Sequence, residues 1–161
     1  MITVREATAA DIGLLQPLVA EMQDHYEGPG VVSGDDVRLR LTEAMTWLPG
    51  GIVLIALETD PVGFATLYEM FPGRYAGTMW YLKEIYVAQA ARGKGVGDML
   101  MQASARAVID RGGTRIEFTT GSDNEGAQRF YERLGAEVIP KVFYRFDDEA
   151  LSKLAGSADE D

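Results

Sequence analysis

The chain contains no cysteine and only one histidine, His25. Without thiols it can form no disulfide, no thiolate zinc site and no cysteine nucleophile. A single histidine also excludes a metal centre built from several histidines. We therefore expect a protein that uses no metal ion, and the lack of cysteine favours a cytoplasmic location.

Long apolar runs and a surplus of positive charge are missing as well. The longest apolar stretch, residues 52–57, is far too short to cross a bilayer, and the first residues lack the pattern of a secretion signal. The formal net charge is −10, whereas nucleic-acid binding depends on a basic surface. We expect neither a membrane nor a nucleic acid as partner. The acidity could steer a cationic amine, or it could simply keep the protein soluble.

The chain has the length and composition of one globular domain: 161 residues, 47% of them hydrophobic and 25% charged. We place the folded domain at residues 1–146. Residues 147–161 form an acidic tail that carries a net charge of −5. We expect a turn of helix through Leu151 and disorder from Gly156 onward.

The first half of the chain predicts one strand and two helices. A strand is expected at residues 2–5, and Thr8 with Asp11 three residues later indicates the start of a helix. Pro17 lies inside that helix and predicts a kink or break near Leu14. A second helix should run from about Asp35, with Val37, Leu41, Ala44 and Leu48 on one face, and end at Pro49-Gly50-Gly51.

Strands dominate the next part of the sequence. The pattern predicts a hairpin of residues 52–58 and 62–70 around Thr59-Asp60-Pro61 and a third strand at 78–87. A helix at 96–111, a strand at 114–120, a helix at 124–134 and an extended pair at 137–146 follow. This order predicts an α+β fold, a mixed sheet with helices on both faces.

A glycine-rich run, Arg92-Gly93-Lys94-Gly95-Val96-Gly97, joins the strand ending at Val87 to the next helix. Glycines let an anion approach the main chain, and the first N–H groups of a helix attract negative charge. One helix terminus contributes only about 0.3–1 kcal/mol at an exposed site, so the loop must offer several donors. A Walker loop and a dinucleotide fingerprint do not fit the glycine spacing. A surface turn that binds nothing is the alternative.

The spacing Arg-x-x-Gly-x-Gly after a strand resembles the acetyl-CoA loop of the GCN5-related N-acetyltransferases, the GNAT family. Residues 124–136 resemble the second signature of that family, because Asn124 opens a helix that carries Phe130-Tyr131 and ends in Leu-Gly-Ala. The resemblance covers roughly residues 1–146 and is nearest to the diamine (spermidine/spermine) acetyltransferases. It implies a single-domain α+β fold with a mixed, mostly antiparallel sheet.

The resemblance also implies an activity, the direct transfer of acetyl from acetyl-CoA to a small primary amine in a ternary complex. The implied acetyl-CoA ligands are Tyr86, Val87, Arg92, Gly93, Lys94, Gly95, Val96, Gly97, Asn124 and Phe130. The alternatives are a non-catalytic acyl-CoA sensor or scaffold, and an acetyltransferase acting on protein or peptide amines. A homodimer is a reasonable expectation.

Two side chains are candidates for proton transfer. A primary amine is neutral only about once in 2,500 molecules at pH 7, so a base is useful, and Glu84 is our candidate. Lys83 replaces the first acid of the diamine pattern, and strand alternation would send Lys83 and Glu84 to opposite faces; a salt-bridged surface glutamate is the alternative. The family's general acid corresponds to Tyr131, which a helical packing stripe could equally explain.

The remaining candidates bind substrate or cofactor. His25, Tyr26 and Glu27, with Tyr75 of the loop 71–75, correspond to the family's acceptor site and could hold an ammonium by charge and cation–π contact, or could simply pack. Asn124 either contacts the cofactor or belongs to a helix start for which Ser122 and Glu125 form a capping pattern. Main-chain N–H groups of the strand 78–87 could serve as oxyanion donors if it bulges or splays near residues 86–88.

Overall fold

The computed structural model describes residues 1–47 and 50–156 and divides into two compact units, Met1–Thr119 and a second that begins at Thr120. The first unit contains one five-stranded sheet in the order β1-β2-β3-β4-β5. All neighbouring strands are antiparallel except β4 and β5, which are parallel. Its strands are β1 (Thr3–Glu6), β2 (Gly51–Leu57), β3 (Pro61–Met70), β4 (Met79–Val87) and β5 (Ile116–Glu117).

Three α-helices belong to the same unit: α1 (Ile12–Glu27), α2 (Gly34–Trp47) and α3 (Val96–Asp110). Three short 3₁₀ turns, η1 (Ala9–Asp11), η2 (Arg74–Ala76) and η3 (Gln89–Ala91), connect the elements. Thr8 donates its backbone N–H to Asp11 Oδ2 at 2.8 Å, which confirms the predicted cap before α1. Arg5 donates two hydrogen bonds to the same carboxylate and thereby keeps the pKa of Asp11 below its usual range.

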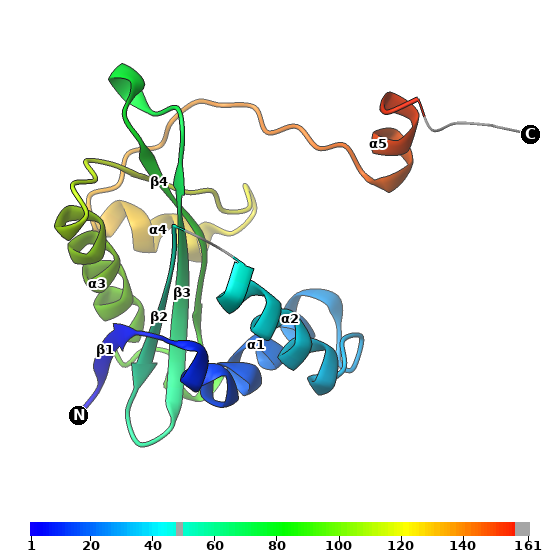
Figure 1. Cartoon of the computed structure of the whole chain (residues 1–161). Helices are drawn as coiled ribbons and strands as arrows, with labels where there is room; N and C mark the ends of the chain where they lie inside the picture. The colour runs from blue at the N-terminus through cyan, green and yellow to red at the C-terminus, as the bar shows by residue number, and fades with distance from the viewer. Residues whose placement is uncertain (48–49, 157–161) are drawn as a thin grey trace, which may run out of the picture. The chain divides into compact units, whose positions relative to one another are not determined.

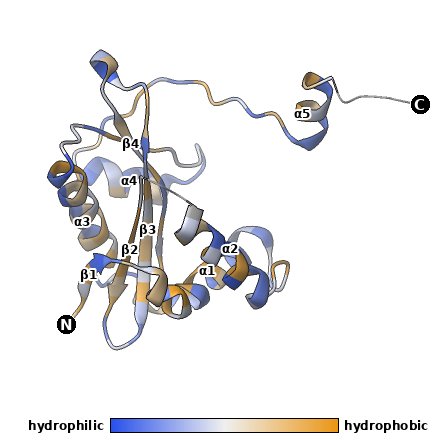
Figure 2. Ribbon diagram, viewed as in Figure 1, coloured by the Kyte–Doolittle hydropathy of each residue, from blue (hydrophilic) through white to orange (hydrophobic). Residues whose placement is uncertain are grey.

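Two hydrophobic cores lie on opposite faces of the sheet, α3 covering one face and α1 with α2 the other (Figure 1). Side chains of β2 alternate between them: Leu54 packs on the α3 side and Ile55 on the α1 side. Figure 2 shows that β2 is apolar along its length, as a strand buried on both faces should be. The predicted α+β fold is therefore confirmed.

Some predicted boundaries are wrong. Helix α1 continues through Pro17 without the predicted break near Leu14, since one lost hydrogen bond does not end a helix whose apolar face is packed on the sheet. The strand predicted at 114–120 shortens to β5, two residues long. Residues 137–146, predicted as an extended pair, form no strand, because none of the described residues supplies them with a ladder of hydrogen bonds. Leu48, Pro49 and the tail after Gly156 lie outside the described residues.

The second unit contains α4 (Glu125–Arg133) and α5 (Asp148–Leu154). The Leu-Gly-Ala sequence ends α4 in a Schellman motif: Ala136 N–H donates to Tyr131 O, Gly135 N–H donates to Glu132 O, and Gly135 adopts φ +89°. Asp147 caps α5 by accepting from Ala150 N–H at 3.0 Å, which confirms helix in the acidic tail. Among the helices built from described residues, none has the length and apolarity needed to cross a membrane.

Candidate functional site

A β-bulge in β4 decides which side chains reach the α1 face of the sheet. Thr66 of β3 pairs with Glu84, whereas the next residue, Leu67, pairs with Leu82, so Lys83 is the extra residue. The bulge reverses the alternation of the strand. Leu82 packs in the core under α3, while Tyr86 packs in the core under α1. The assumption of simple alternation through Lys83 and Glu84 is therefore wrong.

Beyond the bulge, Glu84 meets the C-terminal end of α1. Tyr26 donates its hydroxyl hydrogen to Glu84 Oε1 at 3.5 Å, and the ring of His25 lies 5.3 Å from that of Tyr26. Glu84 is half-buried, and this burial raises the pKa of its carboxyl group against the opposing influence of Lys83. Burial is also the main reason why the pKa of Tyr26 is raised. A carboxylate with a raised pKa beside an exposed aromatic side chain is suited to receive a proton from an ammonium group.

A second carboxylate of α1 binds the end of β4. Glu21 Oε1 accepts hydrogen bonds from the Tyr86 hydroxyl at 2.9 Å and from the backbone N–H of Gln89 at 2.7 Å. Tyr86 is only 4% exposed, and burial, followed by the hydrogen bond to Glu21, raises the pKa of its hydroxyl to about 12. Tyr86 therefore stays protonated and acts as a donor within the sheet core.

The glycine-rich loop follows η3 and opens α3. Gly93 (φ +77°) and Gly95 (φ +78°) both adopt the left-handed conformation, and a Cβ added to either would meet no protein atom within 4 Å. Gly95 is the N-cap of α3, and Val96 is buried beneath it. Within the described part of the chain, no acceptor is found for the N–H groups of Gly93, Gly95, Val96 and Gly97. The loop thus presents a row of backbone donors at a helix N-terminus, as anion binding requires.

The side chain of Arg92 folds back toward β4. Its Nε donates to Val87 O at 3.3 Å, and its guanidinium carbon lies 5.8 Å from the centre of the Tyr86 ring. Lys94 is exposed. Arg92 thereby links the loop to the end of the strand.

Part of the β4 edge has no strand partner. The parallel register with β5 includes only Trp80 and Tyr81, so among the described strands none pairs with the remaining residues of that edge. The bulge of β4 occurs at Lys83 and not near residues 86–88, and a splay of the strand near those residues stays a prediction. The edge from Leu82 to Val87 leaves main-chain groups available to a ligand.

The predicted residues of the second unit form their own arrangement. Asn124 is the N-cap of α4 and accepts the N–H of Ala127 at 3.1 Å, so Asn124, and not Ser122, makes the cap. The rings of Phe130 and Tyr131 are neighbours, with centroids 5.1 Å apart. These contacts show how α4 begins and how its aromatic pair packs, while the catalytic and cofactor roles of the three side chains remain predictions.

Tyr75 lies apart from the Tyr26 and Glu84 pair. It belongs to η2, at the opposite end of the β3–β4 hairpin from Glu84, is 87% exposed, and has φ +56° with Arg74 4.7 Å above its ring. Glu27 is exposed at the last residue of α1. The structure therefore brings together Tyr26, His25 and Glu84 but shows no contact, among the described residues, that joins Tyr75 to them.

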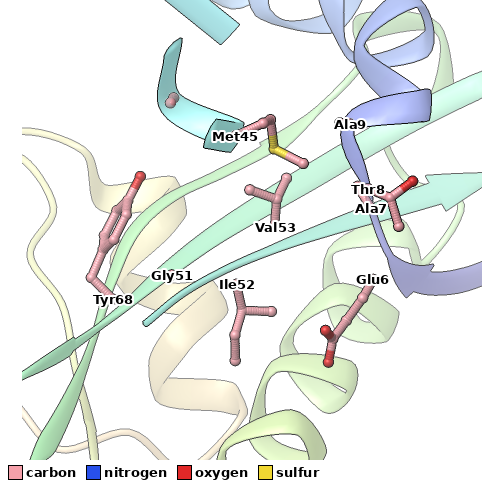
Figure 3. Close-up of a pocket in the computed structure, with 10 residues that line it drawn as sticks. Glu6, Ala7, Thr8, Ala9, Met45, Gly51, Ile52, Val53 and Tyr68 are labelled. Atoms are coloured by element: carbon pink, nitrogen blue, oxygen red, sulfur yellow. The ribbon is translucent and has the colours of Figure 1, made fainter. Parts of the chain in front are cut away.

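A hollow lies on the face of the sheet that α1 and α2 cover (Figure 3). This cavity of about 190 Å³ is bounded by the start of β2, the last turns of α2 and the segment from Glu6 to Ala9. None of the site residues predicted from the sequence lines this cavity. Glu6, in its wall, accepts two hydrogen bonds from Arg111. The described residues also contain no group of three acidic, histidine or cysteine side chains that could hold a metal ion. The side chains that form the candidate site lie instead at β4, the end of α1 and the glycine loop.

Comparison with known proteins assigns the chain to a family. Residues 19–136 match the model of the acetyltransferase (GNAT) family. The chain belongs to the GNAT family. Thialysine N-epsilon-acetyltransferase from Bos taurus is 26% identical over 168 residues, covering 96% of this chain and 98% of the bovine protein.

One further relative matches part of the chain, and one solved structure matches nearly all of its fold. L-ornithine N5-acetyltransferase NATA1 from Arabidopsis thaliana is 30% identical over 96 residues, 60% of this chain and 39% of the plant protein. An integron cassette protein from the mobile metagenome of V. cholerae has a TM-score of 0.89 and 31% identity, covering 96% of this chain and 97% of its own.

As a GNAT acetyltransferase, the protein contains one site residue that the sequence did not indicate. Glu21 joins α1 to both Tyr86 and Gln89, more than sixty positions later. No local motif marks it, because it is one polar residue of an amphipathic helix. A signal was available only indirectly, since a tyrosine hydroxyl that becomes buried in a central strand needs a hydrogen-bond partner.

Proposed function

We propose that this acetyltransferase transfers an acetyl group from acetyl-CoA to a primary amine of a small molecule, by direct attack within a ternary complex. The observation that carries the proposal is the position of Glu84. The bulge at Lys83 directs a half-buried carboxylate with a raised pKa toward Tyr26 at the end of α1. Such a group can remove the proton that keeps an amine unreactive.

The glycine loop fits a diphosphate. Its N–H groups at Gly93, Gly95, Val96 and Gly97 have no acceptor within the described residues, and neither left-handed glycine has a neighbour where a Cβ would lie. Arg92 and Lys94 add positive charge. We assign these residues, with the adjoining Tyr86 and Val87, to acetyl-CoA, which supplies the activated acetyl group; Asn124 and Phe130 are proposed as further ligands.

Each proton in the reaction has a proposed carrier. Glu84, directly or through a water, takes the proton of the ammonium, and the free amine attacks the thioester carbonyl carbon. As the new C–N bond forms and the C–S bond breaks, Tyr131 donates its phenolic proton to the departing sulfur. The attacking nitrogen loses its second proton through solvent to the Tyr131 phenolate, and Glu84 releases its own proton to solvent. No metal ion and no covalent bond to the protein are needed.

The proposed acceptor class is a small cationic amine. Glu84 supplies negative charge, and His25, Tyr26 and Glu27 supply aromatic faces and a further carboxylate at the end of α1. The bovine and plant relatives are named for acetylating the side-chain amines of thialysine and ornithine. We propose the same class of acceptor, a side-chain amine, for this protein, with Tyr75 as a further contact to the amine. We also propose a cytoplasmic location and a homodimeric assembly.

Release of free CoA thiol tests the proposal. We expect the protein to release thiol from acetyl-CoA with at least one member of a panel of diamines and basic amino acids. Glu84→Gln should lower kcat/KM by about 10²- to 10⁴-fold, and Tyr131→Phe should lower kcat beyond any change in the Kd of acetyl-CoA. Glu69→Gln, an exposed glutamate of β3, is the matched control and should leave the rate unchanged. Cofactor binding without turnover across the panel would contradict the enzyme proposed here and favour a sensor.

A further inference from the structure

Glu21 binds two donors from different elements with a single oxygen atom. Its Oε1 lies 2.9 Å from the hydroxyl oxygen of Tyr86, at the end of β4, and 2.7 Å from the backbone nitrogen of Gln89, the first residue of η3. Both distances lie within the usual range of hydrogen bonds, and the bond from Gln89 is at the short end of it. The carboxylate therefore ties helix α1 to the turn that leaves the strand.

The turn held by Glu21 leads directly into the glycine loop. Gln89 O accepts the N–H of Arg92 at 3.3 Å, and Ala91 O accepts the N–H of Lys94 at 3.4 Å. Ala91 is buried, with 3% of its surface exposed. A shift of Gln89 would be passed along this turn and its two backbone hydrogen bonds to Gly93 and Gly95, four and six residues later.

Tyr86 connects Glu21 to the other side of the loop. The guanidinium of Arg92 lies 5.8 Å from the Tyr86 ring centre, and its Nε donates to Val87 O. Glu21 and Arg92 therefore both interact with Tyr86. The direction of the Tyr86 hydroxyl and the position of the loop arginine are set by one connected group of contacts.

We propose that Glu21 is a positioning residue for acetyl-CoA, which holds the backbone donors of residues 93–97 in the geometry that binds the diphosphate. This inference rests on the proposed function of the loop. Glu21 itself need not touch the ligand, because it acts through Tyr86 and Gln89. Helix α1 would then serve both substrates, acetyl-CoA through Glu21 and the amine through Tyr26.

Calorimetric titration with CoA and steady-state kinetics test this role. Glu21→Ala removes both hydrogen bonds and should raise the Kd of CoA and the KM of acetyl-CoA about tenfold, while kcat at saturating acetyl-CoA and the KM of the amine stay close to wild type. Glu21→Gln keeps an oxygen acceptor and should recover most of the affinity. Tyr86→Phe keeps the ring in the core and should weaken CoA binding by about threefold or more through loss of one hydrogen bond.

Glu43→Ala is the matched control, since Glu43 lies on α2 and its only ion pair within the described residues is an exposed one with Arg40. The Kd of this variant for CoA should equal that of wild type. A folded Glu21→Ala protein that binds CoA like wild type, with only a lower Tm, would overturn the inference. If Glu21→Ala does not fold, an unchanged Kd in Tyr86→Phe overturns the inference equally. Failure of the wild-type protein to bind CoA would instead contradict the proposed function.

Discussion

The carboxyl group of Glu84 lies among groups that act on its pKa in opposite directions. Burial has the largest effect and raises it, whereas the charge of Lys83, the backbone N–H of Ile85 and the hydroxyl of Tyr26 lower it. The net shift is upward from the ordinary value for glutamate. The carboxylate form therefore depends on the few groups that stabilise it.

Removal of the Tyr26 hydroxyl should shift the pH profile. Tyr26→Phe deletes a donor to the Glu84 carboxylate, so the pKa of Glu84 should rise further and the acidic limb of kcat/KM should move to higher pH. The measurement is kcat/KM for the amine across pH at saturating acetyl-CoA. A parallel His25→Asn variant shows whether a second titrating group contributes to the limb. A limb that stays in place or moves to lower pH in Tyr26→Phe would contradict the assignment of Glu84 as base.

The sequence could nominate Glu84 and Tyr26 but could not place them together. Strand alternation predicts the facing of a side chain only in an uninterrupted ladder, and one extra residue, Lys83, reverses it. Both faces of β4 are covered by helices, so the apolar pattern alone gives no preference for either register. The contacts of Glu21 could not be predicted for a related reason: its partners Tyr86 and Gln89 are distant in sequence and close only in the fold.

The glycine loop, by contrast, was predictable as an element. Its conformation is local, because left-handed residues at Gly93 and Gly95 are readily adopted only by glycine, and the start of α3 follows from the helical pattern after Val96. The extended pair at 137–146 was not predictable in the same way. A strand needs hydrogen bonds from a neighbour, and the neighbour is decided by tertiary structure and not by the segment itself.

Substitution of two glycines at opposite ends of α3 can separate an effect on CoA binding from an effect of backbone strain on stability. Gly95 (φ +78°) precedes the helix and Gly112 (φ +75°) follows it, and a Cβ on either would meet no protein atom within 4 Å. Gly95→Ala and Gly112→Ala should each destabilise the fold by about 1–2 kcal/mol, because alanine is strained in the left-handed region. Only Gly95→Ala should also weaken CoA binding, since its methyl group enters the space assigned to the diphosphate.

Thermal unfolding measures the stability of both variants, and calorimetric titration measures their Kd for CoA. Equal losses of stability with a raised Kd in Gly95→Ala alone would support the assignment of the loop. If both variants bind CoA with the wild-type Kd, the diphosphate does not lie against Gly95.

The whole chain exposes an unusual concentration of apolar surface in one short segment. Within the segment 136–147, which has no regular secondary structure, six large apolar or aromatic side chains are more than half exposed: Val138, Ile139, Val142, Phe143, Tyr144 and Phe146. Separately, β5 is an edge strand with one neighbour in the sheet. Exposed apolar segments and open strand edges promote association between chains.

We therefore predict that a second copy of the chain covers this segment and that the protein is a dimer. Light scattering coupled to size-exclusion chromatography should give a mass twice that of the 17.6 kDa chain. Phe143→Glu with Val142→Glu should shift the mass toward the monomer, because two charges cannot be buried in an apolar interface without a large cost. Val31→Glu, a change at another exposed valine, between α1 and α2, should leave the dimer intact. A monomeric wild-type protein at micromolar concentration would contradict the prediction, as would a double variant that remains dimeric.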